Sequence, residues 1–137
     1  MSLYTYFTDA EAEGMEPEFM AKLDMARKYA GILRPGLKFI KTCGLRTPEH
    51  NAGLIGAVTD SAHLPDANGL SHAMDFDFGG DDFSLFAALG GLYQAGLKRI
   101  GIYYTMVDGK FTPHHLHVDD DTTKSQGVIW SLLEQNC

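Results

Sequence analysis

The sequence has few cysteines and few basic residues. Its 137 residues include 2 cysteines, and 11 lysines and arginines stand against 18 aspartates and glutamates, for a formal net charge of −7. A nucleic-acid-binding module carries a basic surface, so this balance argues against a nucleic-acid partner. No apolar run approaches the roughly 18 residues of a membrane span. The start of the chain lacks a basic segment followed by an apolar one, so the sequence as given predicts no secretory signal.

The two cysteines, Cys43 and Cys137, do not form a Cys-x-x-Cys pair, which argues against a zinc site built from paired thiolates. Cys43 lies in an apolar run, and we expect it to be a small core residue. Whether the two cysteines form a disulfide is left open by the sequence.

The remaining composition is that of one folded domain. Hydrophobic residues make up 45% and charged residues 21%, a balance typical of globular rather than disordered chains. A chain of this length buries a sizeable core without further crosslinks. We therefore expect a single domain over residues 1–137.

Apolar periodicity and turn residues predict an α+β fold with a small, largely antiparallel sheet packed by helices. Residues 7–14 and 56–72 are expected to be loops, and Asp108-Gly109 predicts a hairpin turn. The expected helices cover 17–31, 48–55, 82–96 and 123–135, and the expected strands cover 37–42, 73–78, 99–104 and 115–119.

The expected helix over 82–96 has an apolar stripe that should face the core. The stripe consists of Phe83, Leu85, Phe86, Leu89, Leu92 and Tyr93.

Titratable residues alternate along two of the expected strands. Asp75 and Asp77 share one strand face, and His115, His117 and Asp119 share one face of another. In both strands the residues between them are apolar, so the carboxylates and imidazoles lie opposite the core. Groups at alternate positions of one strand can converge on one metal or one substrate.

A third polar segment, Ser61-Ala62-His63, precedes the strand of Asp75. Together the three segments offer histidine and aspartate ligands from separate parts of the chain. Catalytic zinc sites use three nitrogen or oxygen ligands and leave a fourth position open. Imidazole and carboxylate suit zinc better than calcium or magnesium, which prefer oxygen alone.

One segment, Cys43-Gly44-Leu45-Arg46-Thr47-Pro48-Glu49-His50-Asn51, resembles the Ser-Gly-Tyr-Arg-Thr-Pro-Glu-His-Asn motif of the M15 zinc peptidases. That family includes D-alanyl-D-alanine carboxypeptidases and L-alanyl-D-glutamate endopeptidases. Its later signatures are matched in order by Ser61-Ala62-His63, Ala73-Met74-Asp75 and His117-Val118-Asp119. The resemblance covers residues 37–119.

By this resemblance the protein has a zinc D-Ala-D-Ala carboxypeptidase (hedgehog/DD-peptidase) type of fold. The implied ligands of one zinc ion per chain are His63, Asp75 and His117. Arg46 matches the family arginine that holds substrate or transition-state charge, and Ser61 is expected to hydrogen-bond a ligand or the substrate. The implied reaction is hydrolysis of D-amino-acid-containing peptide bonds of bacterial peptidoglycan, by carboxypeptidase or endopeptidase action.

The chain departs from the family pattern in two places. Asp75 follows His63 by 12 positions, a longer spacing than is usual in the family, so His72 is an alternative ligand if the alignment shifts locally. The acidic position that many members use as general base is occupied by His114. Strand alternation favours His115 as the base instead, and the choice between the two stays open. Either imidazole is suited to the role, since its ordinary pKa is about 6.5.

Two aspartates, Asp77 and Asp119, are expected to orient the imidazoles, and His50 is expected to be structural. A second interpretation keeps the metal and loses turnover, giving a binding or structural module of a phage or cell-wall assembly. The departure at His114 sustains this alternative. The sequence leaves the oligomeric state and the localisation open, although a peptidoglycan substrate implies a bacterial or phage-derived protein that acts on the cell wall.

Overall fold

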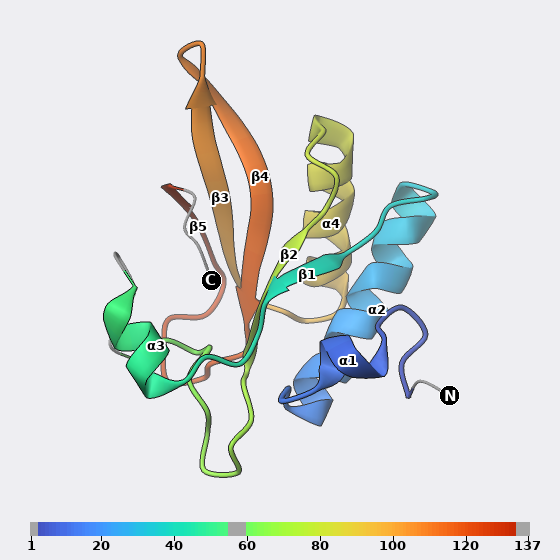
Figure 1. Cartoon of the computed structure of the whole chain (residues 1–137). Helices are drawn as coiled ribbons and strands as arrows, with labels where there is room; N and C mark the ends of the chain where they lie inside the picture. The colour runs from blue at the N-terminus through green and yellow to red at the C-terminus, as the bar shows by residue number, and fades with distance from the viewer. Residues whose placement is uncertain (1–2, 55–59, 134–137) are drawn as a thin grey trace.

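The computed structural model describes residues 3–54 and 60–133 (Figure 1). No helix within these ranges is both long and apolar enough to cross a membrane. The elements, in chain order, are α1 (Asp9–Ala12), α2 (Pro17–Leu33), β1 (Ile40–Cys43), α3 (Pro48–Gly53), β2 (Ala73–Asp77), α4 (Asp82–Gln94), β3 (Arg99–Val107), β4 (Lys110–Asp119) and β5 (Val128–Leu133).

Five strands form one mixed sheet in the order β1-β2-β4-β3-β5. The first three neighbouring pairs are antiparallel, whereas β3 and β5 are parallel. The predicted hairpin joins β3 to β4, and its turn residues Asp108 and Gly109 both have positive φ angles, 51° and 74°. The arrangement is compatible with the predicted α+β class, but its sheet is mixed.

Two predictions about local structure are wrong. The helix expected over 123–135 is instead the strand β5, as far as the described residues reach. Val128, Ile129 and Trp130 are β-branched or aromatic and favour a strand, and they pair with β3 along its free edge. Within the loop expected over 7–14, α1 forms because Thr8 and Glu11 make a reciprocal capping box.

The other predicted helices are confirmed because their start signals are satisfied. Proline opens both α2 and α3, and side chains of Glu16, Thr47 and Asp81 cap α2, α3 and α4. The strands expected over 37–42, 73–78, 99–104 and 115–119 correspond to β1, β2, β3 and β4, with shifted ends. Of the expected loop 56–72, residues 60–72 are described and contain no helix or named strand.

α2 and α4 pack side by side against one face of the sheet (Figure 1). Their approach is very close, because a Cβ atom on Gly91 would lie 2.3 Å from the carbonyl oxygen of Ala26. Small residues therefore line the contact between the two helices. The predicted apolar stripe of α4 is wrong in part, because Phe83, Phe86 and Tyr93 are 50%, 65% and 81% exposed. The buried residues of α4 are Ser84, Ala87, Ala88, Gly91 and Leu92.

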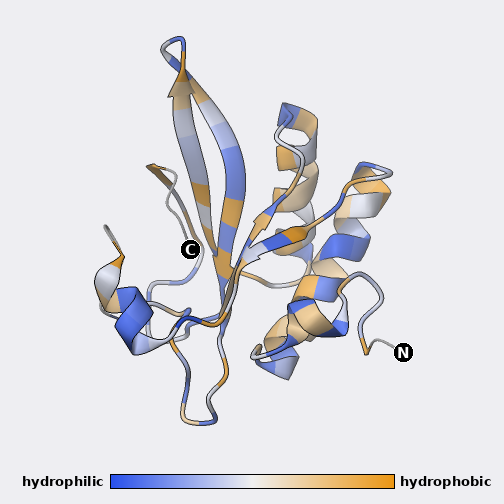
Figure 2. Ribbon diagram, in the orientation of Figure 1, coloured by the Kyte–Doolittle hydropathy of each residue, from blue (hydrophilic) through white to orange (hydrophobic). Residues whose placement is uncertain are grey.

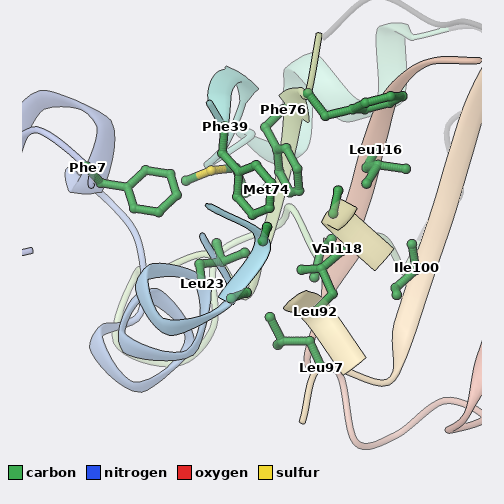
Figure 3. Close-up of a cluster of buried hydrophobic side chains, with 14 of the residues drawn as sticks. Phe7, Leu23, Phe39, Met74, Phe76, Leu92, Leu97, Ile100, Leu116 and Val118 are labelled. Carbon is green, nitrogen blue, oxygen red and sulfur yellow. The ribbon is translucent and has the colours of Figure 1, made fainter. Parts of the chain in front are cut away.

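The core lies between these helices and the sheet (Figure 3). Met74 and Phe76 of β2 and Leu116 and Val118 of β4 are fully buried there. Hydrophilic and hydrophobic residues alternate along β4 (Figure 2), so its polar residues lie on the opposite side. We call this side, which carries Asp75, Tyr103, His115, His117 and Asp119, the site face.

Candidate metal centre

Three side chains from separate segments meet on the site face. Asp75 of β2 and His117 of β4 are register partners across an antiparallel pair, and His63 enters from the preceding loop. Asp75 Oδ1 lies 3.1 Å from His63 Nε2 and 3.0 Å from His117 Nδ1. The two ring nitrogens are 3.2 Å apart. The three atoms therefore form a nearly equilateral triangle, and all three residues are buried.

In each imidazole one ring nitrogen, the inner one, faces the triangle, and the other, the outer one, contacts a hydrogen-bond acceptor. His63 Nδ1 lies 2.8 Å from the carbonyl oxygen of Gly44, and His117 Nε2 lies 2.7 Å from Asp119 Oδ2. A carbonyl and a carboxylate can only accept, so both outer nitrogens donate. Each inner nitrogen of a neutral ring then turns a lone pair toward the Asp75 carboxylate, as in histidines that bind metals.

Three lone-pair-bearing atoms so close together require a cation or a shared proton. A tetrahedral zinc with bonds of about 2.0–2.1 Å spaces its ligand atoms about 3.3–3.4 Å apart. The observed separations of 3.0–3.2 Å between His63, Asp75 and His117 are close to this spacing. The donor set of two imidazoles and one carboxylate also fits zinc.

Charge around the triangle favours a cation. Burial raises the pKa of Asp75, but hydrogen bonds with His117 and His63 outweigh it and hold that pKa well below its usual range. Burial lowers the pKa of His117, but its hydrogen bonds to Asp119 and Asp75 raise it to about 9. The two carboxylates that hold a proton on His117 would equally stabilise a bound metal ion.

Cys43 also reaches this site. Its sulfur and ligand atoms of His63 and Asp75 all lie within 4.8 Å of one another, so these three buried residues could hold a metal ion. Cys43 is disulfide-bonded, however, and it is the thiolate that binds metals. The sequence has one other cysteine, Cys137, which lies outside the described residues. Sequence reasoning missed this contact because a cysteine in an apolar run is typical of a core.

No family model, curated protein or solved structure matches this chain.

The two candidate bases, His114 and His115, both belong to β4. His115 pairs with Tyr103 in the register, and their rings stack with centroids 4.2 Å apart. The Tyr103 hydroxyl lies 3.4 Å from Asp75 Oδ2, so this stack connects His115 to the triangle. Burial raises the pKa of Tyr103, which keeps its hydroxyl a donor.

His114 occupies a register shift between β3 and β4, since Tyr103 pairs with His115 but Tyr104 pairs with Pro113. Such a bulge re-aims the extra side chain. His114 Nε2 lies 2.5 Å from Thr105 Oγ1, and Thr105 lies two residues after Tyr103, on the same strand face. The bulge thus brings His114 to the site face, where regular alternation would not.

Arg46 and Ser61 flank the loop that carries His63. The backbone NH of Arg46 donates to the His63 carbonyl at 2.9 Å, and the Ser61 hydroxyl accepts from the His63 NH at 3.2 Å. Arg46 is 7% exposed as a residue, and its guanidinium donates to Asn51 Oδ1 at 2.9 Å. Its Nε has no hydrogen-bond partner in the described part of the chain.

Three other predicted residues lie away from the triangle. Asp77 is exposed and accepts from the Gly79 NH at 2.8 Å, and within the described ranges no hydrogen bond joins it to an imidazole. His72 faces Asp66 and Asp120 instead of the triangle. His50 is exposed on α3, as its expected structural role allows.

The residues that orient His117 were predicted only in part. Asp119 accepts from His117 as expected, and its other oxygen accepts from Arg99 Nε at 2.8 Å. Trp130 of β5 lies in the segment expected to be a helix, yet its ring centroid lies 5.7 Å from that of His117. It can approach because it stands opposite Gly101, where a Cβ atom would lie 3.0 Å from the indole. The paired Gly101 and Trp130 could have suggested this contact if β5 had been recognised as a strand.

Proposed function

We propose that the protein is a zinc-dependent metallopeptidase that hydrolyses D-amino-acid-containing peptide bonds of bacterial peptidoglycan, on a hedgehog/DD-peptidase type of fold. The observation that carries this proposal is the triangle of His63 Nε2, Asp75 Oδ1 and His117 Nδ1, with edges of 3.0–3.2 Å. The motif resemblance over residues 37–119 supplies the substrate class. Carboxypeptidase and endopeptidase action are both compatible with these residues.

His63, Asp75 and His117 would hold the zinc, which when bound polarises the scissile carbonyl as a Lewis acid. The chain's own contribution is to keep these ligands oriented. Gly44 and Asp119 fix the ring orientation of the two histidines, and such partners raise the basicity of the ligating nitrogen. Because the triangle is buried, competing water is largely kept from the ligand atoms.

Arg46 is suited to bind an anionic part of the substrate. Its guanidinium is buried, and no carboxylate forms an ion pair with it among the described residues. A buried charge without a counter-charge is costly, and its free Nε can donate one further hydrogen bond. A substrate carboxylate or a developing oxyanion would supply the missing negative charge.

We assign the general base to His115, with His114 as the alternative. His115 lies two residues before His117 on the site face and stacks on Tyr103, whose hydroxyl contacts Asp75 Oδ2. The base would take the proton of the attacking water and return it to the leaving amine. The family motif favours His114, so both residues need to be tested.

A second candidate function is a metal-binding module without turnover. The imidazole of His114 at a position that is acidic in many M15 members favours it. This module would bind zinc with the same three ligands and would leave peptidoglycan peptides intact.

Zinc content tests the metal centre first. Purified protein should contain about one zinc per chain, and both His63→Ala and His117→Ala should lose it because each removes a vertex of the triangle. His50→Ala is the matched control, since His50 lies exposed on α3, and it should retain zinc. A wild-type protein that binds no zinc at neutral pH contradicts both candidate functions.

Hydrolysis of defined muropeptides then separates the two functions. The zinc-loaded protein should release a D-amino acid or cleave an internal bond, with product analysis identifying which. Loss of at least about 100-fold in kcat is expected for removal of the base, so His115→Ala should show it and His114→Ala should not. The reverse pattern would move the base to His114, and a zinc-loaded wild type without turnover would favour the module.

A further inference from the structure

A register shift in β1 places the sulfur of Cys43 at the candidate metal centre. Lys41 pairs with Phe76, but Cys43, not Thr42, pairs with Asp75. The extra residue is a β-bulge, a feature that re-aims side chains beside active sites. A regular ladder would put Thr42 opposite Asp75, so the bulge is what brings Cys43 to the site face.

The surroundings of this sulfur suit an anionic ligand. Cys43 is 3% exposed, and Arg46 Nη2 donates to its sulfur at 3.7 Å. Arg46 thus places a positive charge beside the sulfur. Ligand atoms of His63 and Asp75 lie within 4.8 Å of the sulfur. Tetrahedral zinc with bonds of about 2.3 Å to sulfur and 2.0 Å to nitrogen puts these atoms about 3.5 Å apart, so the sulfur has to approach the ligand atoms of His63 and Asp75 by at most about 1.3 Å.

We propose that Cys43 is a redox-controlled fourth ligand of the metal held by His63, Asp75 and His117. When the disulfide is intact, the sulfur carries no charge and the fourth position stays open for substrate. When the disulfide is reduced, the Cys43 thiolate completes a closed shell, as in structural zinc sites. The effect on catalysis rests on the proposed function, whereas the ligation itself requires only a bound metal.

The switching step is a two-electron thiol–disulfide exchange. A dithiol reductant becomes a disulfide, the bond to Cys43 breaks, and each released sulfur becomes a thiol. The thiol proton of Cys43 passes to solvent when its sulfur enters the metal shell. A reducing cytosol would then keep the enzyme closed, and an oxidising exterior, where peptidoglycan lies, would open it.

Cobalt(II) substitution tests the ligation directly, because a cobalt–thiolate bond gives an intense charge-transfer absorption in the near ultraviolet. Cobalt is titrated into oxidised wild type and into wild type reduced with a dithiol that is then removed. Cys137→Ser lacks the only other cysteine in the chain, so it should present a free Cys43 without reductant. Cys43→Ser is the matched control.

Reduced wild type and Cys137→Ser should show the thiolate band and bind cobalt at least about tenfold more tightly than the oxidised protein. Oxidised wild type and Cys43→Ser should bind cobalt without the band. Peptide hydrolysis should fall at least tenfold on reduction of wild type, and that of Cys43→Ser should be insensitive to the reductant. Cobalt bound to the reduced protein without a thiolate band overturns this inference alone, whereas no cobalt bound in any form overturns the metal centre as well.

Discussion

The molecule contains two histidine–aspartate clusters that differ in how many imidazoles face one carboxylate. In the first, at the site face, the outer nitrogens of His63 and His117 donate to Gly44 and Asp119, and the inner nitrogens face Asp75. The three atoms of the triangle thus have no positive charge among them when both rings are neutral. A metal ion supplies that charge and leaves every outer hydrogen bond intact.

In the second cluster a single imidazole lies between two carboxylates. His72 Nδ1 is 2.8 Å from Asp120 Oδ1, and His72 Nε2 is 2.8 Å from Asp66 Oδ2. Both ring nitrogens can donate only if the ring is protonated. Burial lowers the pKa of His72, but the two carboxylates outweigh it and the pKa is raised. Here a proton, not a metal, completes the cluster.

The comparison shows that residue type does not decide between metal and proton. Glu16, His72 and Asp120 also have ligand atoms within 4.8 Å of one another, but they contribute one imidazole, and both of its ring nitrogens already face carboxylates. His117 also lies between two carboxylates, Asp75 and Asp119, so the clusters differ in the second imidazole, His63, whose Nε2 lies 3.2 Å from His117 Nδ1. Two ring nitrogens and one carboxylate oxygen facing one another make a zinc ligand set, which a single imidazole between two carboxylates does not.

The largest effect is expected from removing the charge at the centre of the first cluster. Asp75→Asn keeps the shape of the side chain but not the negative charge that faces two imidazoles. Loss of an outer partner costs roughly 10–100-fold in metal affinity, so loss of this ligand charge should exceed roughly 100-fold. The measurement is a zinc titration against a competing chelator. Asp77→Asn, two residues along the same strand and exposed, is the control and should bind like wild type.

A smaller effect is expected from the partner behind His117. Asp119→Asn replaces the acceptor of His117 Nε2 and should weaken zinc binding about 10–100-fold. Asp120→Asn changes the adjacent residue, which contacts His72 instead, and should leave zinc affinity unchanged. Equal losses in both variants would show that zinc affinity responds to acidic charge in general, and the distinction between the clusters would fail.

Much of this contrast could be predicted from sequence because strand alternation is a local property. The period of two put Asp75, His117 and Asp119 on polar strand faces, and the structure does bring these three together on the site face. Alternation also fixed which side chains enter the core, such as Leu116 and Val118, which are fully buried. Such assignments require only that the strands be recognised.

What could not be predicted depends on tertiary contacts. Val128–Leu133 has residues compatible with either element, and it is a strand because β3 offers a free edge. Cys43 and His114 reach the site face through register shifts that no alternation pattern encodes. Asp77 keeps the predicted face, yet its carboxylate is used locally by Gly79.

The second cluster should reveal itself in stability rather than in metal binding. The pKa of His72 is raised above its ordinary 6.5 in the fold, so its contribution is complete below about pH 6.5 and is lost as the pH rises through the folded-state value. His72→Gln should therefore lower the free energy of unfolding near pH 6 and have less effect near pH 9. The His72–Asp120 ion pair is partly exposed and should account for about 0.2–1 kcal/mol. Urea unfolding of both proteins at the two pH values measures this, and a loss that grows with pH would contradict it.

The smallest effect should come from the second oxygen of Asp75, which tests how far the first cluster extends. Tyr103 donates to Asp75 Oδ2 over a long 3.4 Å contact, while its ring stacks on His115 at 4.2 Å. Tyr103→Phe removes the hydroxyl and keeps the stack, so we expect a change of about 0.5 kcal/mol, or two- to threefold, in zinc affinity. Tyr103→Leu also removes the stack and should in addition lower turnover if His115 is the base. If Tyr103→Phe weakened zinc binding as much as Asp119→Asn, the Tyr103 hydroxyl would matter for zinc affinity as much as the acceptor of His117 does. Zinc affinity would then depend on the hydrogen-bond partners of the Asp75 carboxylate as well as on those of the two imidazoles.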